Sequence, residues 1–171
     1  MEYIFAYLKG GIRSRHLLGL IGAACIGFLG IALLLQHFKD VLPCPLCVLQ
    51  RYALLAVALF SLSGAVIGWP RVGAALAALA SLSGLGLASY QLWVRATPGV
   101  LCGFDPVETF VNRLPSANWL PFMLYADGNC ADDTFRLFWL SLPMWGLLSF
   151  SAFTVVLIWL ALRHEEPRAA G

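Results

Sequence analysis

The chain has 171 residues, of which 60% are hydrophobic and 12% are charged, and its mean hydropathy is +0.81. In ordinary soluble domains about a quarter of the residues are charged, so this composition excludes that class and predicts a protein that lies in a lipid bilayer. The net charge of +2 gives no indication of nucleic-acid binding.

Four apolar segments are long enough to cross a bilayer, which requires about 20 residues per helix. We expect the spans at residues 17–35, 47–69, 72–94 and 144–162. Lys9, Arg13 and Arg15 precede the first segment, as in a secretory signal. That segment is longer than a usual signal core, however, and no small-x-small cleavage site follows Leu35, so we expect a retained helix.

Two features predict how these helices pack. The sequence Gly68-Trp69-Pro70-Arg71 is a very short turn, which makes the second and third spans an antiparallel pair. Small residues at four-residue spacing predict close contact between helices. They are Gly19, Ala23 and Gly27 in the first span, and Gly73, Ala77, Gly84 and Ala88 in the third.

An even number of crossings places both termini on one side of the membrane and the loops at 36–46 and 95–143 on the other. The terminal side carries the larger share of the basic residues, whereas the loops carry most of the acidic ones. Because Lys and Arg are enriched on the cytoplasmic side, we expect cytoplasmic termini and external loops. Four of the five cysteines then lie near the external face, where disulfides persist.

The second external loop carries a helical pattern. Val107, Phe110, Val111 and Leu114 recur at helical spacing, which predicts a short helix lying in the headgroup region. The predicted fold is therefore an all-α membrane protein, with one domain over residues 1–171. It is a four-helix transmembrane bundle with a short interfacial helix in the second external loop.

The cysteine pair Cys44-Pro45-Leu46-Cys47 stands at the start of the second span. Two sulfurs at this spacing on a helix start share one face within reach of a disulfide, and the helix dipole favours a thiolate there. A structural disulfide gains little entropy in so small a loop. A zinc site normally needs a second closely spaced pair, and we expect no metal. A redox role is favoured over both alternatives.

Cys102 and Cys130 are 28 residues apart in the same external loop. A disulfide between them is either structural, stabilising the loop by restricting the unfolded chain, or a partner for thiol–disulfide exchange with the first pair. Cys25 lies in mid-span, where a lone thiol behaves as a small hydrophobic side chain. We assign no role to Cys25.

Arg51 follows Cys47 by one helical turn. A cation at the bilayer centre costs roughly 2.5–3.5 kcal/mol. One interpretation is that it lies near the surface and snorkels outward. The other is that it stabilises a neighbouring thiolate and the negative charge on a reduced carbonyl-bearing acceptor, which in a lipid phase is most naturally a quinone.

These motifs resemble the disulfide bond formation protein B (DsbB) family of bacterial inner-membrane oxidoreductases. Besides the pair at 44–47 and Arg51, the resemblance is carried by Trp119-Leu120-Pro121, by Gly128-Asn129-Cys130-Ala131, and by the segment 139–145, which reads Trp-Leu-Ser-Leu-Pro-Met-Trp.

The resemblance implies a function and a role for each site residue. A reduced periplasmic thioredoxin-fold oxidase of the DsbA kind would attack a Cys102–Cys130 disulfide, with Cys102 in the mixed disulfide. Cys44 would exchange with the loop, Cys47 would face a membrane quinone, either ubiquinone or menaquinone, and Arg51 would support quinone binding. The chain departs from the best-known family member after Tyr90, where Gln91 and Leu92 stand in place of a histidine, so the sequence does not determine whether the third span contacts the quinone.

Two other classes remain open. A relative of the vitamin K epoxide reductase family would share the bundle and the use of quinone, but that family places its active cysteine pair late in the chain. A non-enzymatic membrane protein would have inert structural disulfides or bound metal.

Overall fold

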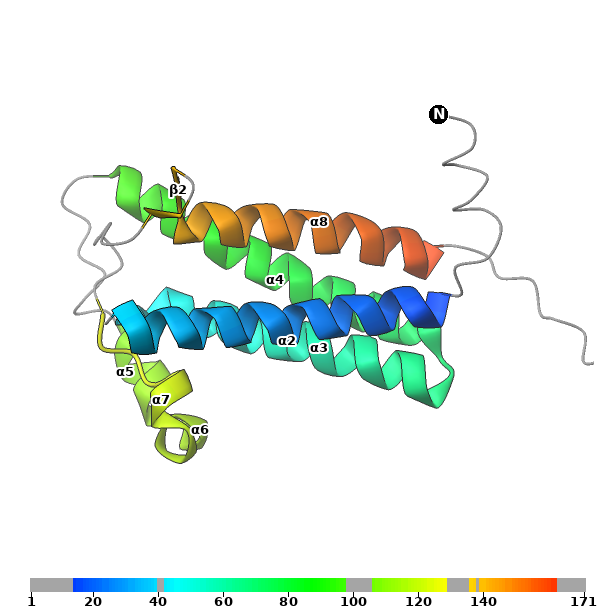
Figure 1. Cartoon of the computed structure of the whole chain (residues 1–171), viewed down its shortest axis with the longest axis horizontal. Coiled ribbons are helices and arrows are strands. Elements are labelled where there is room, and N and C mark those ends of the chain that lie inside the picture. The colour runs from blue at the N-terminus through cyan, green and yellow to red at the C-terminus, as the bar shows by residue number, and fades with distance from the viewer. Residues whose placement is uncertain (1–13, 40–41, 98–105, 129–135, 138, 163–171) are drawn as a thin grey trace, which may run out of the picture.

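The computed structural model describes residues 14–39, 42–97, 106–128, 136–137 and 139–162. Four long helices form a bundle, with shorter elements gathered at one end (Figure 1). The long helices are α2 (Ser14–Lys39), α3 (Pro45–Ile67), α4 (Pro70–Ala96) and α8 (Leu142–Leu162). Each is long and apolar enough to cross a membrane, so the predicted all-α membrane bundle is confirmed.

The helices extend beyond the predicted spans at most ends. α2 continues to Lys39 because backbone hydrogen bonding does not stop where the apolar segment stops. α3 begins at Pro45, two residues earlier than predicted, because proline at the first helical position gives up an N–H group that has no partner there. α3 ends at Ile67, where Gly68 takes the left-handed conformation with φ of 90°.

α3 and α4 are the predicted antiparallel pair, joined by Gly68 and Trp69. Close to this turn the two backbones meet at Gly64 and Gly73. A Cβ added at Gly73 would lie 2.6 Å from the Gly64 Cα atom. Glycine at both positions therefore permits this approach.

The prediction for the first span is wrong in its choice of face. Gly19 and Gly27 have no atom within 4 Å of an added Cβ, and Ala23 and Gly27 are exposed. The contact is made by Gly22, where a Cβ would lie 2.6 Å from Leu62 of α3. The predicted positions in α4, in contrast, are all buried: Gly73, Ala77, Gly84 and Ala88.

The core away from the site is built from all four long helices. It combines leucine, isoleucine and Cys25 from α2 with small residues from α3 and α4 and two leucines from α8. Its buried members are Leu18, Ile21, Cys25, Val57, Ala58, Ala74, Ala77, Ala78, Leu157 and Leu160. Cys25 is fully buried in this cluster, as expected of a small hydrophobic side chain.

In the part of the loop between α4 and α8 that the structure describes, three short helices each begin with proline: α5 (Pro106–Arg113), α6 (Pro115–Trp119) and α7 (Pro121–Leu124). α5 is the helix predicted in this loop. Its Val111 is fully buried beside Val48 of α3, whereas Phe110 is 61% exposed. The strands β1 (Arg136–Leu137) and β2 (Leu140–Ser141) form a two-residue antiparallel pair before α8, which the sequence did not predict.

Candidate functional site

The cysteine pair lies at the N-terminus of α3. Cys44 is the N-cap residue, and its sulfur accepts a hydrogen bond from the backbone N–H of Cys47 at 3.2 Å. Cys44 is 3% exposed and packs beside Leu46 and Val94. Cys47 is half-buried on the first helical turn. The two cysteines therefore occupy different environments: Cys44 is buried in the protein, whereas Cys47 is partly accessible.

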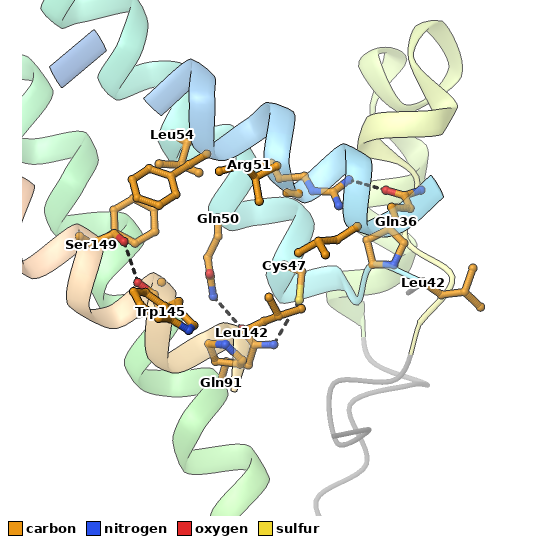
Figure 2. Close-up of a pocket in the computed structure, with 18 residues that line it drawn as sticks. Gln36, Leu42, Cys47, Gln50, Arg51, Leu54, Gln91, Leu142, Trp145 and Ser149 are labelled. Atoms are coloured by element: carbon orange, nitrogen blue, oxygen red, sulfur yellow. Dashed lines mark hydrogen bonds between the residues drawn. The ribbon is translucent and has the colours of Figure 1, made fainter. Parts of the chain in front are cut away.

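Gln91 of α4 connects the two sulfurs. Its side chain is fully buried, and its Nε2 atom donates hydrogen bonds of 3.2 Å to the sulfurs of both Cys44 and Cys47. The Nε2 atom of Gln50 donates in turn to Gln91 Oε1 at 2.7 Å. Figure 2 shows Gln50 and Cys47 of α3 turned toward Gln91.

Arg51 is the charged residue of the site. It is 7% exposed, and its Nη1 atom donates to Gln36 Oε1 at 3.0 Å and to the backbone carbonyl of Met123 at 2.6 Å. Its guanidinium therefore connects α2 with α7. Arg51 also lies one helical turn below Cys47. These contacts hold the guanidinium of Arg51 inside the protein, and its proposed role in charge stabilisation stays a prediction.

These groups face a cavity of about 310 Å³ between the helices (Figure 2). Its walls are mostly apolar, and a few polar groups converge on it: Gln36, Cys47, Gln50, Arg51, Gln91 and Ser149. The apolar lining comes from Phe28, Ile31, Ala32, Leu35, Leu42, Pro43, Leu54, Leu142, Pro143, Trp145, Gly146 and Phe150. Small-molecule sites in proteins have this character, with an apolar wall and few polar contacts that set orientation.

The loop between α4 and α8 is bound next to Cys44. The backbone N–H groups of Asp127 and Gly128 both donate to the carbonyl of Pro43 at 3.1 Å. Asn112 of α5 fixes the same segment through two hydrogen bonds of 2.9 Å with the backbone of Ala126. A Cβ at Gly128 would collide with the carbonyl of Leu42, so glycine is required for this contact.

The predicted site residues divide into two groups. The structure brings Cys44, Cys47 and Arg51 together, with Cys47 and Arg51 on the cavity wall. Cys102 and Cys130 lie outside the described residues, although Cys130 follows Gly128 by two positions in the sequence. Within the described part of the chain, no group of three or more His, Cys, Asp or Glu side chains is arranged to hold a metal ion.

Sequence reasoning missed two side chains and one backbone group at the site. Gln91 was noted only where a histidine was absent, and Gln36 and the Met123 carbonyl were not singled out. The signal available for Gln91 was its chemistry, because a buried amide in an otherwise apolar span requires a partner. Gln50, one residue before Arg51 on α3, also lines the cavity and donates to Gln91.

Comparison with known proteins gives the family. The family model for disulfide bond formation protein DsbB matches residues 14–160. The chain belongs to the DsbB family. Disulfide bond formation protein B of Herminiimonas arsenicoxydans is 45% identical over 156 residues, covering 90% of this chain and 99% of the relative.

Two further DsbB relatives have lower identity over a similar length. The protein of Ralstonia nicotianae is 37% identical over 90% of this chain and 98% of its own length. The protein of Burkholderia thailandensis is 38% identical over 90% and 92%. The family match confirms the resemblance and favours it over a vitamin K epoxide reductase-like protein. The chain is a multi-pass membrane protein of disulfide bond formation, with an oxidoreductase role.

Proposed function

We propose that this protein reoxidises a periplasmic thioredoxin-fold oxidase of the DsbA kind and passes the electrons to a membrane quinone. The observation that carries the proposal is that the Cys47 side chain and the buried Arg51 line one apolar cavity inside a bundle of membrane-spanning helices. A quinone is an apolar electron acceptor that enters from the bilayer, so both the location and the chemistry of the cavity suit it.

The residues around the cavity fit a quinone head group. The volume of about 310 Å³ is at the lower end of ligand pockets, about 300–1,000 Å³, and is suited to a substituted ring. Arg51 and Gln50 supply hydrogen-bond donors for carbonyl oxygens, while Phe28, Trp145 and Phe150 supply apolar contact. Both ubiquinone and menaquinone have such a head group.

The proposed reaction consists of three two-electron steps. The oxidase dithiol reduces a Cys102–Cys130 disulfide, so that the oxidase gains its disulfide and the loop gains two thiols. The loop dithiol then reduces the Cys44–Cys47 disulfide and recovers its own. Finally the Cys44–Cys47 dithiol gives up two electrons and two protons, which reduce the quinone to the quinol and re-form the disulfide.

Each site residue has a physical role in these steps. Cys44, which follows the Pro43 carbonyl that binds Asp127 and Gly128, exchanges with the loop cysteines. Cys47 presents its sulfur to the cavity, and Arg51 stabilises negative charge on the sulfur and on the reduced acceptor. Because the cavity is largely apolar, that charge stabilisation is stronger than it would be in water.

The proposed location is the bacterial inner membrane, with the termini in the cytoplasm and the cysteine loops in the periplasm. The start of α3, the end of α4 and the short helices α5 to α7 all lie at one end of the bundle (Figure 1). That arrangement supports a single external face for thiol exchange, and the bias of Lys and Arg toward the other face supports its orientation.

The test is to follow quinone absorbance in purified protein mixed with reduced oxidase. We expect no turnover in Cys44→Ser or Cys102→Ser and weaker use of quinone in Arg51→Ala. Cys25→Ala is the control, because Cys25 lies in the core cluster and does not line the cavity, and it should turn over as wild type does. Unchanged quinone reduction in Cys44→Ser would remove the proposed route. Loss confined to Arg51→Ala would indicate a quinone protein without thiol chemistry.

A further inference from the structure

Gln91 is the one amide among the described residues that donates to both sulfurs of the redox pair. A single nitrogen, Nε2, lies 3.2 Å from the sulfur of Cys44 and 3.2 Å from that of Cys47. The side chain is fully buried, so these sulfurs take the place of water as its hydrogen-bond acceptors. A buried amide with this geometry acts on both ends of the disulfide-forming pair at once.

The direction of the Gln91 amide is fixed by its other partner. A carboxamide has a donor end and an acceptor end, and the acceptor end, Oε1, is taken by Gln50 Nε2 at 2.7 Å. The donor end must then face the sulfurs. Gly146 of α8 leaves room for this arrangement, because a Cβ there would lie 2.9 Å from Gln50 Oε1.

The two redox states of the pair use this donor differently. A thiolate is a charged acceptor, and hydrogen bonds to charged groups are roughly twice as strong as those between neutral groups. A disulfide sulfur is neutral and accepts weakly. The Gln91 N–H groups therefore stabilise the reduced, ionised pair more than the disulfide. Stabilising the reduced form makes a pair a stronger oxidant.

We propose that Gln91, held in position by Gln50, is a positioning residue that stabilises the reduced Cys44–Cys47 pair and so draws electrons from the loop cysteines toward the cavity. This inference rests on the proposed function and adds a residue that favours electron flow from the loop cysteines to the Cys44–Cys47 pair. An amide supplies this stabilisation without a second positive charge beside Arg51, which would repel it in an apolar environment.

The experiment measures the thiol–disulfide equilibrium of Cys44 and Cys47 in purified, quinone-depleted protein. The full-length protein is equilibrated in glutathione buffers of known ratio and alkylated, and the peptide that contains both cysteines is quantified by mass spectrometry. In Gln91→Met, which preserves side-chain length and removes the donor, we expect the equilibrium constant to shift about tenfold toward the disulfide. A tenfold shift corresponds to about 30 mV for this two-electron couple.

Variants at Gln50 test the role of the second amide. Gln50→Met should shift the equilibrium in the same direction by about threefold, because the Gln91 amide is then free to turn. Gln50→Met combined with Gln91→Met should equal Gln91→Met alone. This double variant leaves neither amide without its partner, so it also serves if the single change impairs folding. Ser89→Ala, on the exposed face of α4, is the control and should match wild type.

Two results would overturn the inference. One is an equilibrium constant within twofold of wild type in both Gln91→Met and the double variant. The other is full additivity of the two changes, which would mean that Gln50 does not act through Gln91. Because no quinone or oxidase takes part, this outcome is separate from the proposed function. That function fails if wild-type protein does not reduce quinone with the oxidase, whatever the value of the equilibrium constant.

Discussion

Two glycines of α4, two residues apart, should respond in opposite ways to the same substitution. Gly84 faces the ring of Phe150 in α8, and a Cβ there would lie 2.5 Å from Cζ and 2.7 Å from Cδ1. Gly86 has no atom within 4 Å of an added Cβ. Phe150 is 1% exposed and lines the proposed quinone cavity, so the comparison joins helix packing to function.

The magnitude follows from two opposing terms. Alanine in place of glycine inside a helix stabilises it by up to about 1 kcal/mol. An extra methyl group forced into a packed site costs about 1–3 kcal/mol. We therefore expect Gly86→Ala to be neutral or slightly stabilising. Gly84→Ala should be less stable than Gly86→Ala by about 1–3 kcal/mol, and its displaced Phe150 ring should raise the KM for quinone.

The assay is denaturation of both variants in the same detergent, together with steady-state quinone reduction. Equal stability of the two variants would contradict the close α4–α8 contact in the structure. A destabilised Gly84→Ala protein with an unchanged KM for quinone would contradict the assignment of Phe150 to the wall of the quinone site.

Three further predictions concern the loop, the cation and the packing of α4 on α8. Gly128→Ala should release the loop segment from Pro43, because a methyl group forced against the Leu42 carbonyl costs about 1–3 kcal/mol. Quinone reduction driven by the oxidase should then fall about tenfold or more. Quinone reduction driven by a small dithiol should persist. Arg51→Met should raise the KM for quinone about 10- to 100-fold, through loss of a charge-assisted hydrogen bond. Ser81→Ala and Thr154→Val each remove one side of a buried 2.8 Å hydrogen bond, and a double-mutant cycle in detergent should give a coupling energy of about 0.6 kcal/mol.

Each of these predictions has a control or a contradicting result. Gly19→Ala is the control for Gly128→Ala. Gly19 has open space around it, so this substitution should leave both oxidase-driven and small-dithiol-driven quinone reduction unchanged. Arg71→Met, at the other end of α4 from the cavity, should not alter the KM for quinone. In Gly128→Ala, an equal loss of oxidase-driven and small-dithiol-driven quinone reduction would show that Gly128 does more than attach the loop to Pro43. A zero coupling energy between Ser81 and Thr154 would refute their hydrogen bond.

The sequence predicted the number of spans, their order and the turn at Gly68, because hydropathy and turn chemistry are local properties. It did not predict which face of α2 meets its neighbours. Residues 19, 23 and 27 and residues 18, 22, 25 and 29 form adjacent stripes on one helix, and both stripes contain small side chains. The second stripe is buried because it packs against the other three long helices, with Gly22 in contact with Leu62 of α3.

The sequence predicted the part of the candidate site that lies along one helix. Cys44, Cys47 and Arg51 follow from the spacing along α3. Gln91 is 40 residues beyond Arg51 in the sequence, and its contact with the sulfurs depends on how α4 packs against α3. The Met123 carbonyl is a backbone group, which no residue type identifies in advance.

The most direct test of electron transfer from the cysteine pair to quinone is a single turnover without the oxidase. Protein whose Cys44–Cys47 pair has been reduced is mixed, without oxygen, with one equivalent of quinone, and both the quinol formed and the thiols consumed are counted. We predict one quinol for each dithiol that becomes a disulfide, and no quinol in Cys47→Ser. Quinol formation by Cys47→Ser at the wild-type rate, or without consumption of thiols in the wild type, would contradict this route.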